Sequence, residues 1–158
     1  MKNMSTVISI VGGLYLLLSC SHHQPTLQTS VNSDDSVKNL ILSKEKETLD
    51  RWYHGDPMGF ADNSWKDITY FDPSLKTRID SLDAFRKLLT PLIGQIHIPW
   101  HRMDKPLIRV FGDIAVLSFT DVFAIDKDTA RWHATEIYLH REKDWKLIHS
   151  HWTESKVK

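Results

Sequence analysis

Long β-rich runs alternate with short polar turns from residue 96 to residue 153. The runs are residues 96–111, 114–125, 131–141 and 144–153. Side chains on a strand alternate between two faces, and short turns join neighbouring strands in antiparallel order. The sequence therefore predicts a four-stranded antiparallel meander. Pro99 and Pro106 interrupt its first run, which suits an edge strand or a bulge.

The segment before Gly94 has mainly helical periodicity. Apolar residues from position 37 to 53 recur at near-helical spacing, and residues 34–36 offer an N-cap. Gly55-Asp56-Pro57 ends this helix, because a residue before proline disfavours helical geometry. A short helix over residues 57–63 and a helix through residues 82–89, which Asp80 or Ser81 caps and Pro91 interrupts, are also expected.

Two brief strands, at residues 68–71 and 78–79, separate these helices. Helices followed by a meander indicate an α+β fold, in which the N-terminal helices pack on one face of a strongly curved antiparallel sheet.

The first twenty residues have the pattern of a secretory signal. A short basic leader precedes an apolar run that is too short to span a bilayer, and Leu17-Leu18-Ser19-Cys20 follows. This motif resembles the lipobox of bacterial lipoproteins, which implies removal of residues 1–19 and acylation of Cys20. The expected location is the bacterial cell envelope, with a lipid anchor on the periplasmic side or at the outer membrane. The alternative is an ordinary signal with a chance cysteine.

The remaining chain divides into a tether and one domain. Residues 20–36 comprise Cys20 and a polar stretch with too few apolar side chains to form a core, so a disordered tether is expected. Residues 37–158 have the length of one domain. Cys20 is the only cysteine, so no intramolecular disulfide stabilises the domain. Lys and Arg total 20, as do Asp and Glu, so no net field attracts nucleic acid.

Four segments, in this order and spacing, resemble the NTF2-like superfamily and in particular its SnoaL-like branch. They are Trp52-Tyr53-His54-Gly55-Asp56, Ile68-Thr69-Tyr70-Phe71-Asp72-Pro73, Phe111-Gly112-Asp113-Ile114-Ala115-Val116-Leu117 and Trp145-Lys146-Leu147-Ile148-His149-Ser150-His151-Trp152. The resemblance covers the chain from residue 37 onward. It implies a cone whose open end often holds a small molecule, and a homodimer through the outer sheet face. Functions in this superfamily vary widely, so the fold does not settle the activity.

Asp72 is the candidate general base. In ketosteroid isomerases, which share this fold, an aspartate before a proline at the end of the first strand abstracts the proton, and Asp72-Pro73 is similar. The tyrosine that stabilises their enolate is missing, because Thr48 occupies the corresponding position. Their second donor falls at Thr135 or Glu136, so Asp72 and Glu136 form the candidate catalytic pair. Alternatively, Asp72 only initiates a turn.

Strand periodicity and the resemblance together predict the pocket wall. Trp132, Ala134, Glu136 and Tyr138 share one strand face, and Ile148, Ser150 and Trp152 share a face of the last strand. Kinase association domains of this fold end in a similar strand and direct basic residues into the cavity at the positions of Glu136 and Trp152. An acid and an indole stand there in this chain, which favours an apolar, aromatic or cationic ligand over a carboxylate.

The predicted ligand-contacting residues are aromatic or hydroxyl side chains of these strands: Trp65, Tyr70, Trp100, Trp132, Tyr138, Ser150 and Trp152. The alternative is that Glu136 pairs with an arginine such as Arg102 and that Trp152 only packs. His149 and His151 belong to the opposite face, together with Trp145 and Leu147.

No cofactor or metal is expected. Two histidines at i and i+2 would need a further ligand such as His133, and no HExxH or clustered acidic motif is present. Three functions stay open. The first is a membrane-tethered domain that binds a small, largely apolar molecule. The second is an acid–base isomerase, lyase or hydrolase, and the third is a structural dimerisation module whose own tryptophans fill the cone.

Overall fold

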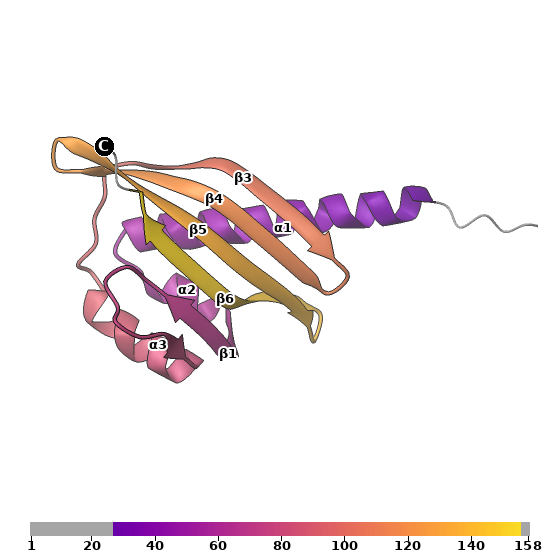
Figure 1. Cartoon of the computed structure of the whole chain (residues 1–158), viewed down its shortest axis with the longest axis horizontal. Coiled ribbons are helices and arrows are strands. Elements are labelled where there is room, and N and C mark those ends of the chain that lie inside the picture. Colours follow the sequence, from indigo (N-terminus) through magenta and orange to yellow (C-terminus); the bar gives the residue numbers. More distant parts are fainter. Residues whose placement is uncertain (1–26, 156–158) are drawn as a thin grey trace, which may run out of the picture.

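The computed structural model describes residues 27–155, with side chains from residue 33 onward. The elements, shown in Figure 1, are α1 (Leu27–Tyr53), α2 (Met58–Asp62), β1 (Ser64–Phe71), β2 (Ile79–Asp80), α3 (Leu82–Leu89), the 3-10 helix η1 (Thr90–Leu92), β3 (His101–Phe111), β4 (Ile114–Ile125), β5 (Asp128–Arg141) and β6 (Asp144–Glu154). The predicted signal peptide and Cys20 lie outside the described residues. Within the described part of the chain, no helix is long and apolar enough to cross a membrane.

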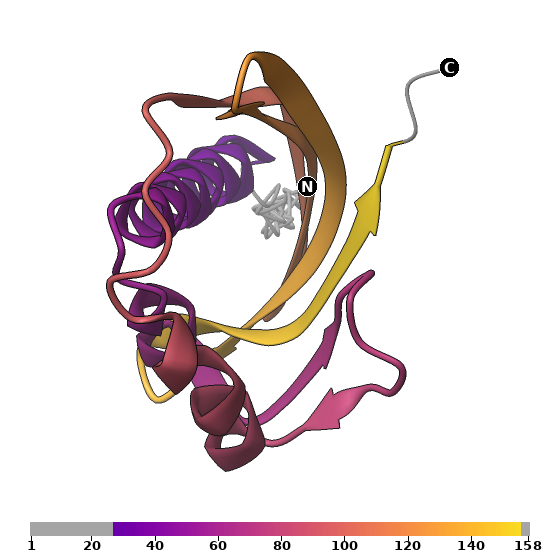
Figure 2. The same ribbon diagram turned by 90° about the vertical axis from the view of Figure 1, so that its left-hand side faces the viewer.

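A six-stranded sheet forms the body of the domain and curves around α1 (Figure 2). Its strand order is β2-β1-β6-β5-β4-β3, and β3 to β6 form the predicted antiparallel meander. The predicted antiparallel sheet also contains one parallel pair, β1 with β6, so the sheet is mixed. Since β1 lies far from β6 in the sequence, turn patterns could not reveal this pairing.

Helix α1 begins at Leu27, before the predicted domain boundary at residue 37. The second part of the predicted tether is therefore helical, and residues 34–36 lie inside the helix instead of capping it. Asp35 and Lys38, one turn apart, form an exposed ion pair at 2.9 Å. Once a helix has been nucleated by the packed part of α1, each added residue costs little, so a polar stretch can extend it. The helix ends where Gly55 adopts a positive φ of 89°.

The segment before β3 is a connection and not part of a strand. Strand β3 begins at His101, whereas the sequence predicts a strand from residue 96. The Gly94 amide donates to the Gly55 carbonyl at 2.8 Å, and the Ile98 amide donates to the Tyr53 carbonyl at 3.0 Å. These bonds tie the connection to the end of α1. As predicted, Pro106 lies at an irregularity of the edge strand, where the register of β3 against β4 shifts.

A bulge in β6 reverses the predicted facing of part of the last strand. Glu136 lies opposite Ser150, but Tyr138 lies opposite Leu147, so Ile148 is an extra residue. Trp145 and Leu147 are therefore buried on the same side as Ser150 and Trp152. The prediction that they share a face with His149 is wrong, because a bulge shifts the alternation by one residue.

The core lies between the helices and the concave face of the sheet. Helix α1 contributes a stripe at four-residue spacing, namely Ile41, Glu45, Leu49 and Tyr53. Ser81 caps helix α3, because its hydroxyl accepts from the Ala84 amide at 3.3 Å, and the helix buries Phe85 and Leu89. This N-cap confirms one of the two predicted.

The outer sheet face carries exposed apolar side chains on β3. Leu107 and Phe111 are 49% and 63% exposed. The homodimer through this face stays a prediction.

Candidate functional site

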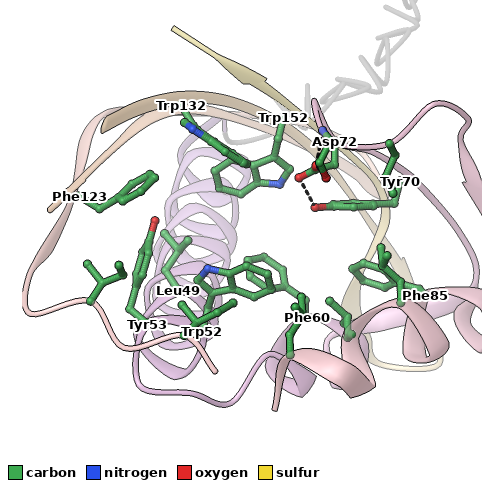
Figure 3. A pocket seen from close by; sticks show the side chains of 17 residues that line it. Leu49, Trp52, Tyr53, Phe60, Tyr70, Asp72, Phe85, Phe123, Trp132 and Trp152 are labelled. Atoms are coloured by element: carbon green, nitrogen blue, oxygen red, sulfur yellow. Dashed lines mark hydrogen bonds between the residues drawn. The ribbon is translucent and has the colours of Figure 1, made fainter. Parts of the chain in front are cut away.

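A cavity of about 370 Å³ opens between α1, α3 and the concave face of the sheet. Figure 3 shows the side chains of the 17 residues that line it. Nearly all are aromatic or aliphatic. Among the described residues of this lining, Asp72 is the only charged one.

Three tryptophans dominate the cavity wall. Trp132 and Trp152 extend from β5 and β6, and Trp52 lies opposite them on α1 (Figure 3). The Trp132 and Trp152 rings are 6.4 Å apart with an interplanar angle of 59°. The Trp52 ring meets Phe60 edge to face at 5.7 Å. Trp132 and Trp152 thus line the cavity.

Asp72 lies at the end of β1 and faces the cavity (Figure 3). The Tyr70 hydroxyl donates to Asp72 Oδ2 at 3.0 Å. The Ser74 amide donates to Oδ1 at 2.8 Å, and the Ser74 hydroxyl also donates to Oδ1. The Leu75 amide donates to the Asp72 carbonyl at 3.0 Å. Asp72 therefore both initiates a turn and contributes a carboxylate to the cavity.

Tyr70 is the polar partner of Asp72. Its side chain, one of those predicted to contact a ligand, is buried in the cavity wall. Burial raises the pKa of the Tyr70 hydroxyl well above its usual range, and the negative charges of Asp72 and Glu136 raise it further. Tyr70 therefore stays protonated and directs its proton at Asp72.

Glu136 lies in a buried polar layer beneath the cavity and does not line it. Ser150 donates to Glu136 Oε1 at 3.0 Å. The Tyr138 hydroxyl lies 2.6 Å from Glu45 Oε2 and 3.2 Å from Glu136 Oε2, and its single proton serves one of them at a time. Glu45, Glu136, Tyr138 and Ser150 are all fully buried. Glu136, Tyr138 and Ser150 lie on the predicted concave face of the sheet, but the prediction that they line the pocket is wrong, because other side chains cover them. Strand alternation predicts the face of a side chain and not how deeply it is buried.

Two carboxyl groups are buried in this layer, and Glu45 Oε1 has no hydrogen-bond partner in the described part of the chain. Burial, followed by the charge of Glu136, raises the pKa of Glu45 well above its usual range. Burial also raises the pKa of Glu136, and the hydrogen bonds from Ser150 and Tyr138 act against this rise. Because the pKa of Glu45 is raised well above its usual range, Glu45 is the carboxyl that we expect to be protonated at neutral pH. The alternative pairing of Glu136 with Arg102 is also wrong, since Arg102 Nη2 donates to Asp104 at 3.0 Å.

Two predicted tryptophans lie away from the cavity. The Trp65 indole donates to the Leu139 carbonyl at 3.1 Å, and Lys146 Nζ lies 5.3 Å from its ring centroid. Trp100 is 43% exposed in the connection before β3. Because this connection is not a strand, alternation does not apply to Trp100, and its predicted place in the site is wrong.

His149 and His151 lie on the outer face beside Phe71. His149 Nδ1 shares a 2.8 Å hydrogen bond with the Thr69 hydroxyl. The His151 ring is 5.2 Å from that of Phe71. Burial, and then the charges of His151 and Arg78, lower the pKa of His149. No group of three or more His, Cys, Asp or Glu side chains in residues 33–155 could hold a metal ion.

One polar pair near the cavity was not predicted. The Tyr53 hydroxyl donates to Asp121 Oδ2, and Asp121 is fully buried. Asp121 Oδ1 and His101 Nδ1 are buried without a hydrogen-bond partner. Burial raises the pKa of Asp121. Asp121 follows Phe119 at the inward phase of β4, so alternation was the signal that could have found it.

Comparison with known families identifies the chain. The calcium/calmodulin-dependent protein kinase II association domain matches residues 40–156. The chain belongs to this family. Comparison with curated protein sequences gives no match.

Solved structures of known proteins share this fold. A ketosteroid isomerase-like protein of Parabacteroides distasonis is 33% identical, with a TM-score of 0.66 over 73% of this chain and 86% of that one. The association domain of C. elegans calcium/calmodulin-dependent kinase II is 18% identical, with a TM-score of 0.66 over 77% of this chain and 98% of that one. An NTF2-like protein of Pseudomonas putida is 20% identical, with a TM-score of 0.64 over 78% and 87%. The fold is therefore NTF2-like, as predicted.

Proposed function

We propose that this domain binds a small, largely apolar molecule in the cavity. The observation that supports this most directly is an open cavity of about 370 Å³ with aromatic and aliphatic walls and one carboxylate. Sites for small molecules typically measure about 300–1,000 Å³ and combine apolar walls with a few polar groups that orient the ligand.

The buried polar layer supports binding over a purely structural role. The Trp152 indole donates to the Ser150 hydroxyl at 2.8 Å, and Ser150 in turn donates to Glu136. Turning a hydrogen-bonded indole away from its acceptor costs free energy, because the buried N–H would be left without a partner. Trp152 is thus held against the sheet instead of filling the cone.

Acid–base catalysis by Asp72 is the second candidate. It is favoured by the position of Asp72 at the cavity wall, within 3.0 Å of the Tyr70 hydroxyl. Proton abstraction next to a carbonyl also requires a donor for the developing enolate. Thr48, which stands at the position of the missing tyrosine, is buried and donates to the Lys44 carbonyl at 2.8 Å. Tyr70 already donates to the carboxylate itself. Binding therefore has the stronger support.

We also propose that a lipid on Cys20 anchors this binding domain to a membrane. The support for this anchor is the Leu17-Leu18-Ser19-Cys20 motif, which precedes the described helix. Radiolabelled palmitate should be incorporated into the wild-type chain in a bacterial host and not into Cys20→Ala. Equal labelling of the two proteins would refute the anchor.

The binding function is tested by native mass spectrometry of the purified domain, followed by calorimetric titration with the molecule that co-purifies. Leu92→Trp places an indole at the cavity, whereas Leu107→Trp makes the same change on the exposed outer face. Leu92→Trp should weaken binding at least tenfold, and Leu107→Trp should bind like the wild type. Equal binding by both variants would place the ligand elsewhere, and absence of any bound molecule would contradict the proposal.

A further inference from the structure

The charge of the cavity points to one class of ligand. Among the described residues that line it, Asp72 is charged and no lysine, arginine or histidine is present. We propose that the cavity selects an organic cation, in which an amine or quaternary ammonium group is attached to an apolar body. This inference rests on the proposed binding function and names the chemistry of its ligand.

Asp72 lacks a cationic partner in the described part of the chain. All of its side-chain hydrogen bonds come from neutral donors, namely the Tyr70 hydroxyl and the amide and hydroxyl of Ser74. An ionised carboxylate accepts about four hydrogen bonds, and Oδ2 receives only the one from Tyr70. A partly buried carboxylate without a counter-charge is costly, and a bound cation would compensate it.

The aromatic wall adds a second attraction for a cation. Indole is the side chain with the strongest cation–π interaction, and three tryptophans line this cavity. Trp132 and Trp152 are inclined at 59° to each other, so they border the cavity as two differently oriented surfaces. Phe71 pairs with His151 where β1 runs parallel to β6, so Asp72 and Trp152 follow at adjacent positions of the two strands, and both line the cavity. Trp52 lies across the cavity from them (Figure 3). A cation near Asp72 would therefore contact an indole as well.

The buried acids behind the wall reinforce this preference. The Trp152 N–H donates to Ser150, and Ser150 donates to Glu136. Hydrogen bonds in such a chain polarise one another, which makes the indole ring richer in electrons. The charge of Glu136 also acts on the Tyr70 hydroxyl in the cavity wall. The same charges disfavour a carboxylate ligand, because no cation in the described lining would offset its charge.

The test uses three probes with one naphthalene body: 2-naphthylmethylamine, 2-naphthalenemethanol and 2-naphthoate. Calorimetric titration at pH 7 and low salt should show the amine binding at least tenfold more tightly than the alcohol, and the naphthoate more weakly than the alcohol. Asp72→Asn should reduce the preference for the amine to less than about threefold and leave the alcohol within about twofold. Asp67→Asn, an equal change of charge at an exposed residue paired with Arg141, should retain the wild-type preference.

The outcomes separate the two proposals. Equal affinity of the wild-type domain for amine and alcohol would overturn cation selection and leave the binding function intact. Absence of binding by all three probes would overturn both. A preference that survives in Asp72→Asn would show that Asp72 is not its source. Because the wild-type comparison alone decides cation selection, the test does not depend on the folding of the variant.

Discussion

The buried carboxyl pair makes the stability of the domain depend on pH, and Glu45→Gln should remove a large part of that dependence. Glu45 and Glu136 are fully buried, and the raised pKa of Glu45 predicts that this carboxyl holds a proton at neutral pH. A glutamine at position 45 has nearly the shape of the protonated acid, and its amide oxygen can accept from the Tyr138 hydroxyl in the same way. The variant therefore imitates protonated Glu45 at every pH.

The sign and size of the effect follow from the raised pKa of Glu45. In the unfolded chain this group titrates near its ordinary value of 4.5. Above that pH the folded protein holds a proton that the unfolded chain has released, so the wild-type free energy of unfolding falls as pH rises towards the folded-state pKa. One proton corresponds to about 1.4 kcal/mol per pH unit at 25 °C. The free energy of unfolding of Glu45→Gln, relative to that of the wild type, should thus grow by about 1.4 kcal/mol per pH unit within this window.

Urea unfolding followed by tryptophan fluorescence at several pH values between 5 and 8 measures this difference. Glu47→Gln removes the same formal charge at an exposed position of the same helix and serves as the control. Its difference from the wild type should change little with pH. If the difference between Glu45→Gln and the wild type were constant from pH 5 to pH 8, Glu45 would be ionised in the fold and its raised pKa would be refuted.

Three further perturbations test single contacts. Gly55→Ala should lower the free energy of unfolding by about 1–2 kcal/mol, because φ is +89° and the new Cβ would lie 2.9 Å from His97 Cε1. An unchanged thermal midpoint would contradict this. Tyr53→Phe should cost about 1–3 kcal/mol in urea unfolding, since Asp121 loses its donor, and a neutral effect would show that this bond contributes nothing. His149 should titrate below 6.5 by NMR. Between that midpoint and 6.5 the folded state binds fewer protons, so its stability rises with pH; a midpoint at or above 6.5 would refute the desolvation of His149.

The meander and the helices could be predicted because their signals are local. Turn residues and strand alternation lie close together along the chain, and Ser81 caps α3 through a contact three residues away. The parallel pairing of β1 with β6 and the extra residue at Ile148 could not be predicted, since they depend on contacts across the sheet. When Ile148 is counted as the extra residue of the bulge, strand alternation gives the observed facing of Trp145 and Leu147.

The candidate site was predictable in part for the same reason. Asp72 stands in a recognisable dipeptide, and Trp132 and Trp152 have the inward phase of their strands. Whether an inward residue reaches a cavity depends on what packs in front of it. Glu136 and Trp132 share one face of β5, yet Trp132 lines the cavity and Glu136 is covered. Sequence patterns do not show whether an inward side chain is covered, because this depends on how α1 packs across the concave face of the sheet.

The covered polar layer explains how an aromatic cavity can stay open. Collapse of an apolar cavity lined by large rings would stabilise the fold, because the rings that close the cavity would bury more apolar area. Trp152 would have to leave the Ser150 hydroxyl to do so, and Ser150 is itself committed to Glu136. From their raised pKa values we expect the buried acids to reduce the stability of the fold at neutral pH, while their hydrogen bonds fix the ring that borders the cavity. This combination is difficult to justify for a structural module, whose core would be more stable without the acids, and it is expected of a domain that must keep space for a ligand.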